Sequence, residues 1–167
     1  MKIKVQDFTA RFCGSGEYRH GIYVPEDVRL LLMQCSLSGD EFCEVSDNIF
    51  DGIEDAKRTD EMRTIQYNNI SELRLAGMKA ESEDDDDSAI ELYAEAIEMG
   101  EASQFDLLHA YRHAYDRIIM LLSRTRAYAR EASYIERLLK HQLQDADRER
   151  LTARLEKTMT KLNKIQK

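Results

Sequence analysis

His109 and His113 stand four residues apart in the second half of the chain, and Asp106 and Asp116 lie three residues outside them. On a helix this spacing places all four side chains on one face, where two histidines can grip one zinc or iron ion. A third ligand would have to come from elsewhere, and no glutamate follows the first histidine as in zinc proteases. A metal-dependent helical protein is therefore one hypothesis. The alternative is a helix–helix hydrogen bond or an Asp–His surface pair.

The acidic run at residues 81–88 contains four consecutive aspartates, 84–87. Calcium loops space their oxygen ligands at alternating positions, place a glycine at the bend and end with a bidentate glutamate. This run has no such glycine. We interpret it as the exposed turn between two paired helices, with its last carboxylates at the positive end of the following helix.

Residue types that carry other chemistry do not occur in recognisable patterns. The sequence has no glycine-rich phosphate loop, no nucleophile elbow and no cysteine–histidine signature, so we predict a protein that is not an enzyme and needs no cofactor. Cys13, Cys35 and Cys43 make no metal-type pairing, and their odd number argues against a disulfide framework. Together with the lack of a signal-peptide core or a membrane-length apolar run, this predicts a cytoplasmic protein with no membrane contact.

The elements that would position these residues are mostly helices. The 167 residues include one proline and seven glycines, and few internal breakers favour a mostly α protein. Residues 1–24 differ, because their apolar residues are β-prone and 14–16 (Gly-Ser-Gly) is suited to a turn. We expect a short β-hairpin or extended arm there, packed on the helices or on another chain of a homo-oligomer, followed by a single helical domain at 25–167.

Capping signals and apolar spacing predict the boundaries of these helices. Pro25 opens a helix that runs to Leu37, and the capping-box spacing of residues 38–41 opens a second one that carries Phe42 to Ile53. A third runs from Thr59 to Ala80, with a break at 68–69 left open. Further helices are expected at 88–99, ended by Gly100, and at 103–124, 130–141 and 144–167.

Small residues and one aromatic recur between Leu73 and Ala96 at the spacing of a helix–turn–helix repeat. Gly77 precedes Ala89 by twelve residues, Tyr93 follows four later, and Ala96 three after that. Small residues there let two antiparallel helices approach closely, and the tyrosine fills the next gap. This unit resembles a tetratricopeptide repeat (TPR), with Leu73 where the family usually has tryptophan.

A second unit resembles the divergent bacterial form of the repeat, whose helices open with Tyr-Asp/Glu-Arg and Tyr-x-Arg-Glu. The matching stretches are residues 115–117 and 128–131. Ile119 and Glu131 replace small residues of the family, so we expect the helices of this unit to sit further apart or at another angle. The resemblance implies a TPR-like α–α superhelix. Its parts would be units at about 69–100 and 103–141, and a capping helix at 145–165.

In this family the first helix of each unit lines a concave surface that holds peptides or partner helices. The resemblance therefore implies a protein or peptide partner, held by adaptable methionines and charge-pairing arginines. The alternative is that the same residues are ordinary surface side chains. The clamp of lysine and asparagine that holds a terminal carboxylate in some members is absent, because the matching positions hold no asparagine. The implied binding residues are Arg74, Leu75 and Met78 of the first unit, and His113, Asp116, Arg117, Met120 and Arg124 of the second.

Charge is unevenly distributed along the chain, whose net charge is −8. Residues 112–167 contain 14 lysines and arginines against seven acidic residues, whereas residues 1–111 contain 10 against 25. Solvated helices explain this distribution, and so does an electropositive face for an acidic peptide or a nucleic acid. We predict a non-enzymatic interaction scaffold or adaptor. A nucleic-acid-associated protein that uses the basic half is the alternative, and the metal-dependent protein is the third hypothesis.

Overall fold

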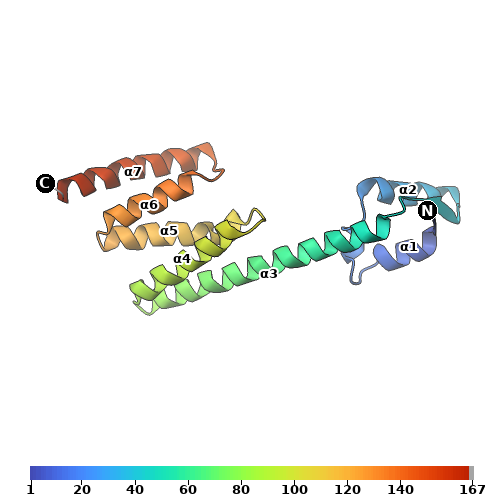
Figure 1. Ribbon diagram of the computed structural model, residues 1–167, viewed down its shortest axis with the longest axis horizontal. Coiled ribbons are helices and arrows are strands. Elements are labelled where there is room, and N and C mark those ends of the chain that lie inside the picture. Colours follow the sequence, from blue (N-terminus) through green and yellow to red (C-terminus); the bar gives the residue numbers. More distant parts are fainter. Residues whose placement is uncertain (166–167) are drawn as a thin grey trace. The chain divides into compact units, whose positions relative to one another are not determined.

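The computed structural model describes residues 1–165 and has a mostly α fold, as predicted (Figure 1). Within the described residues it contains seven α-helices, one 3₁₀ turn and one two-stranded antiparallel sheet. The chain forms two compact units, Met1–Thr64 and Ile65–Lys167. The predicted boundary at residue 24 is thus replaced by one at residue 64, because the N-terminal segment packs with the helices that follow it.

The first unit is built around a small sheet and two short helices. Strand β1 (Lys2–Lys4) pairs antiparallel with β2 (Phe42–Glu44), and Ile3 faces Cys43 in the register. Helix α1 (Val5–Phe12) follows β1, the 3₁₀ turn η1 spans Arg19–Gly21, and helix α2 is Glu26–Ser38. The core of this unit consists of buried side chains from both strands, from α1 and α2, from the residues on either side of η1 and from the start of the next helix: Ile3, Val5, Phe8, Phe12, Tyr18, Val24, Val28, Leu32, Cys43, Ile49 and Ile53.

Three details of this unit differ from the prediction. Val5, Phe8 and Phe12 are buried on one side of a helix, because their spacing of three and four residues is helical although their types favour strands. The strand partner of β1 comes from residues 42–44, where a helix was predicted. Gly39 adopts a left-handed conformation with φ of 77° and ends α2, so it terminates a helix instead of belonging to a capping box.

Helix α3 (Ile49–Ser82) is a single helix of 34 residues. The predicted start at Thr59 is wrong, because the Thr59 hydroxyl donates to the carbonyl of Asp55 at 2.8 Å and so bonds within the helix instead of capping one. No break occurs at residues 68–69. The turn predicted from the acidic run is confirmed, since α3 ends at Ser82 and α4 begins at Asp86.

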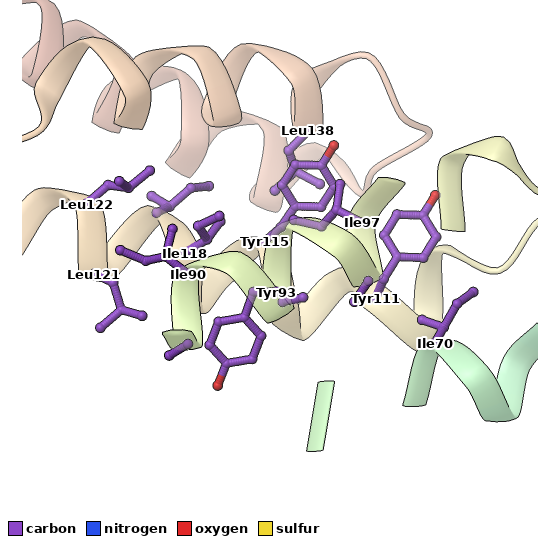
Figure 2. Packing of buried hydrophobic residues seen from close by; sticks show 14 of the residues in the cluster. Ile70, Ile90, Tyr93, Ile97, Tyr111, Tyr115, Ile118, Leu121, Leu122 and Leu138 are labelled. Atoms are coloured by element: carbon purple, nitrogen blue, oxygen red, sulfur yellow. The ribbon is translucent and has the colours of Figure 1, made fainter. Parts of the chain in front are cut away.

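The second unit packs the C-terminal part of α3 and four further helices around one hydrophobic core. These are α4 (Asp86–Ala102), α5 (Leu108–Arg124), α6 (Tyr128–Leu139) and α7 (Asp145–Ile165). Successive helices pack on one another, and Figure 2 shows Tyr93 and Ile97 of α4 in the same cluster as Tyr115 and Ile118 of α5. The predicted end of the last helix at residues 166–167 lies outside the described residues.

Two buried glycines allow close helix contacts in this core. A methyl group on Gly77 would lie 2.7 Å from Cε1 of Tyr93, and one on Gly100 would lie 2.8 Å from Cγ of Tyr111. The role predicted for Gly77 is therefore confirmed, as a place where α3 approaches the tyrosine of α4. Gly100 does not end its helix as predicted; it lies inside α4, where only a hydrogen atom fits beside the ring. Between residues 1 and 165, no helix is both long and apolar enough to span a membrane.

Candidate functional site

A carboxylate near the end of α3 joins three consecutive helices of the second unit. Glu81 accepts hydrogen bonds from the Tyr93 hydroxyl of α4 at 3.1 Å and from Nε of Arg117 on α5 at 3.0 Å, and Nη2 of Arg117 pairs with its other oxygen. Arg117 holds the pKa of Glu81 below its usual range, whereas burial and Glu81 raise the pKa of Tyr93 to about 12. We call these three residues the Glu81 cluster.

The same arrangement recurs one helix later. Glu101 of α4 accepts from the Tyr115 hydroxyl of α5 and from Nε of Arg137 on α6 at 2.7 Å, and its Oε1 lies 2.9 Å from Nε2 of His141. In both clusters the arginine follows the glutamate by 36 residues. Burial would raise the pKa of Glu101, but its three partners outweigh burial and lower it. We call this set the Glu101 cluster.

A third carboxylate attaches the last helix. Glu131 of α6 is almost fully buried, and its Oε1 accepts from Nε of Arg154 on α7 at 3.0 Å. Arg154 also donates to the carbonyl of Ile119 on α5 at 3.3 Å. Arg154 thus joins the buried Glu131 side chain of α6 and the backbone of α5 to the last helix.

Two adjoining pockets lie along one face of the second unit. The first, of about 400 Å³, lies between α3 and α5. The second, of about 330 Å³, lies between α5 and α7. Arg117 borders both of them. The first is lined by Met78, Glu81, Ser82, His113 and Arg117, and the second by Asp116, Arg117, Ile119, Met120, Arg150, Leu151 and Arg154. We call this surface the α3–α5–α7 face.

Five of the eight predicted binding residues line these pockets: Met78, His113, Asp116, Arg117 and Met120. The other three line neither. Arg74 is half-buried on α3, Leu75 is exposed, and Arg124 is exposed and paired with Asp86. The arrangement predicted for the first helix of each unit therefore brings most of these residues together, and the last helix completes the surface.

The two histidines of the metal hypothesis take part in aromatic contacts. The ring of His109 stacks on Tyr67 with a centroid distance of 5.4 Å, and His113 meets Tyr93 edge to face at 6.3 Å. Burial, then Arg74 and Arg117, lower the pKa of His113. Asp106 lies before α5 and accepts from the backbone N–H of Leu108. Among residues 1–165, no group of three or more histidine, cysteine or acidic side chains is placed to hold a metal ion.

Many arginines of the basic half already have carboxylate partners. Arg117, Arg137 and Arg154 pair with glutamates, Arg124 pairs with Asp86, and Arg112 lies 3.5 Å from both Asp116 and Asp147. Carboxylates of the same unit therefore neutralise much of its positive charge. The count of 14 basic residues therefore overstates the free charge that α5 and α6 can offer to a partner.

Sequence reasoning missed Glu81, Ser82, Ile119, Arg150, Leu151 and Arg154 as parts of this surface. Glu81 was assigned to the solvated acidic run, and its hydrogen bond with Tyr93, twelve residues later, was not predicted. A detectable signal existed for α7, where Arg150 and Arg154 are one helical turn apart. Comparisons with protein-family models, with curated protein sequences and with solved structures found no match to this chain.

Proposed function

We propose that this chain is a non-enzymatic scaffold or adaptor with a degenerate TPR-like core, which holds a segment of a protein partner on its α3–α5–α7 face. The observation that carries the proposal is the meeting of α3, α5 and α7 around two adjoining pockets that display Met78 and Met120. Exposed methionines adapt to varied apolar partners, and helix grooves are a common site for peptide recognition.

A protein partner fits this face better than a nucleic acid. Nucleic-acid surfaces combine unpaired cations with stacking aromatics, whereas Arg117 and Arg154 on this face are already bound to carboxylates. Among the described residues, no phenylalanine, tyrosine or tryptophan lines the two pockets of this face. The free apolar surface of Met120 beside these paired arginines favours contact with a protein segment.

Site-specific photo-crosslinking tests the proposal. A photoreactive amino acid replaces Met78 or Met120 on the face, or Met99 on α4, in living cells that produce the chain, and mass spectrometry identifies the products. Met99 is the matched control, because it is 37% exposed, as Met120 is, and lines neither pocket. We expect one crosslinked protein shared by the first two positions and missing from the third. Products only at Met99, or at no position, would overturn the proposal.

Substitution provides the second measurement. Met120→Glu should reduce recovery of the crosslinked protein at Met78 by at least tenfold, since it places a charge in the apolar contact, while Met99→Glu should leave recovery unchanged. Charge reversal at Arg117 is less informative, because it would also break the Glu81 cluster.

A further inference from the structure

Helix α2 in the first unit carries an apolar face that no described residue covers. Leu30, Met33 and Leu37 are 49%, 54% and 81% exposed. Their spacing of three and four residues places them on one side of the helix, opposite to Val28 and Leu32, which are buried. Anchors at positions i, i+3 and i+7 are the pattern by which an amphipathic helix docks into a groove.

Acidic residues stand at both ends of this face. Glu26 and Asp27 are exposed in the first turn of α2, and Asp40 and Glu41 are exposed just after Gly39. Glu41 lies 3.7 Å from Lys4, which is itself exposed. Two α2 helices that packed against each other would bring acids together in either direction: parallel pairing opposes the N-terminal acids, and antiparallel pairing opposes the N-terminal to the C-terminal acids. The face is therefore suited to a basic partner surface.

A basic stripe runs along α7 beside the α3–α5–α7 face. Arg150, Arg154, Lys157, Lys161 and Lys164 follow one another at intervals of four and three residues, which aligns them on one side of the helix. The first two line the pocket shared with α5, so the stripe borders this pocket. Arg150 pairs with Asp147 and Arg154 with Glu131. Within the described residues, Lys157 and Lys164 form no ion pair, and Lys161 lies over the ring of Tyr128 at 5.3 Å, so the lysines carry the free charge of the stripe.

We propose that the α2 face of one chain docks on the α3–α5–α7 face of a second copy of this chain. Leu30, Met33 and Leu37 would lie over Met78 and Met120, and the acids that flank α2 would meet the α7 stripe. The 13 residues of α2 extend about 20 Å at 1.5 Å per residue, and the rise from Arg150 to Lys164 is about 21 Å, so the stripe matches α2 in length. The inference rests on the proposed function, since it names an occupant of the same face.

Such contacts join two different surfaces, so each copy keeps one free α2 face and one free α3–α5–α7 face. Association of this head-to-tail kind continues into rings or filaments and does not stop at a symmetric dimer. Because exposed charges contribute, raising the salt concentration should weaken it. These two properties distinguish it from a two-fold pairing of apolar faces.

Sedimentation velocity of the purified full chain over a range of concentrations tests the inference. Wild type should grow beyond a dimer as concentration rises. Leu30→Glu with Leu37→Glu should be monomeric, and so should Met120→Glu with Lys157→Glu. Two controls should associate as wild type does: Ser36→Glu with Ser38→Glu adds the same charge to α2 but keeps its leucines, and Met99→Glu with Arg130→Glu makes the same kinds of change on α4 and α6.

Mixing the two disabled variants gives the decisive result. Each retains the surface that the other has lost, so an equimolar mixture should form a dimer and nothing larger. A monomeric mixture, a monomeric wild type at about 10⁻⁴ M, or loss of association in either control would overturn the inference.

Failure of this inference differs from failure of the proposed function. These experiments contain only the purified chain, so their outcomes do not affect the finding of a different protein that is crosslinked at Met120. Absence of any crosslink there would instead remove the proposed function. Wild type that binds a 20-base-pair duplex through Lys157 would replace the inference with a phosphate-binding stripe.

Discussion

The Glu81 cluster and the Glu101 cluster use the same three residue types, with glutamate and arginine 36 residues apart, but they adjoin different surfaces. The first borders a pocket with the exposed Met78. The second borders a pocket of about 560 Å³ lined mainly by polar residues, and its glutamate gains a third partner in His141. Ion pairing therefore holds successive helices of the unit together, whereas exposed apolar side chains distinguish the surface proposed for binding.

The largest expected effect is at Glu131, which is almost fully buried and, within residues 1–165, pairs with no cation other than Arg154. Arg154→Met should lower the free energy of unfolding by about 3–5 kcal/mol, since it leaves a buried carboxylate without its partner. Adding Glu131→Gln should recover much of the loss. Urea unfolding measures both, with Arg150→Met, which removes an exposed pair with Asp147, as the near-neutral control. Similar losses at positions 150 and 154 would contradict the assignment.

Removing the carboxylate of each cluster compares how much the two clusters contribute to the free energy of unfolding. Glu101→Gln should cost about 3 kcal/mol and Glu81→Gln about 2 kcal/mol, since charged hydrogen bonds are lost and Glu101 has the additional partner His141. Double-mutant cycles with Arg137→Met and Arg117→Met isolate the pairwise part. If Glu101→Gln and Glu81→Gln lower the free energy of unfolding equally in a chain that carries His141→Phe, the histidine accounts for the difference between the two clusters.

The clusters also predict how stability depends on pH. The pKa of both glutamates is lower in the folded chain than in the unfolded chain, where a glutamate titrates at about 4.3. Their contribution is therefore present above that pH and is lost as the pH falls through the folded values. Wild type should exceed the Glu81→Gln, Glu101→Gln variant by several kcal/mol at pH 7 and by much less at pH 3, as urea titrations at the two values would show. A difference in unfolding free energy that stays the same at both pH values would contradict this assignment.

Substitution of Gly77 and of Gly100 by alanine should lower stability by different amounts, because each glycine lies against a different part of a tyrosine ring. Gly100→Ala should cost about 2 kcal/mol, since its methyl would meet Cγ of Tyr111, which is fixed close to the backbone. Gly77→Ala should cost about 1 kcal/mol or less, because the far ring edge of Tyr93 can shift and alanine improves helix propensity. Thermal unfolding of the two variants checks the order, and a larger loss at Gly77 would reverse the comparison.

Most helices of the second unit could be predicted because their apolar residues recur at helical spacing. Tyr111, Tyr115, Ile118 and Leu122 of α5 are buried, as the spacing predicts. The clusters could not be predicted, since Glu81 reads as one more acid of a solvated run until α5 brings Arg117 to it. Neither its pairing nor that of Glu131 has a local signal in the sequence.

The first unit was less predictable, and the reason is local ambiguity. Its short apolar segments are compatible with strand or helix by residue type, and only tertiary pairing selects β1 and β2. Gly39 likewise suits a helix start within a capping box and a left-handed helix end; its φ of 77° decides for the end. The predicted TPR-like register included Met78 and Met120, which do line the pockets, whereas the contribution of Arg154 depends on the packing of α7.

The smallest expected effects are at the N-terminal ends of α4 and α5. Asp85 caps α4, where its carboxylate accepts from the N–H of Ser88 at 3.1 Å. Hydrogen bonds with the side chain of Ser88 and then with its N–H lower the pKa of Asp85. Asp106 precedes α5 and accepts from Leu108 at 3.3 Å, a longer bond one position outside the cap. Asp85→Ala should therefore cost about 1 kcal/mol and Asp106→Ala about half as much, while Asp87→Ala, at an exposed position after the cap, should change stability by less than about 0.5 kcal/mol. Unfolding midpoints in urea would rank them. If Asp87→Ala cost as much as Asp85→Ala, the acidic run would act through its total charge at the start of α4 and not through one capping carboxylate.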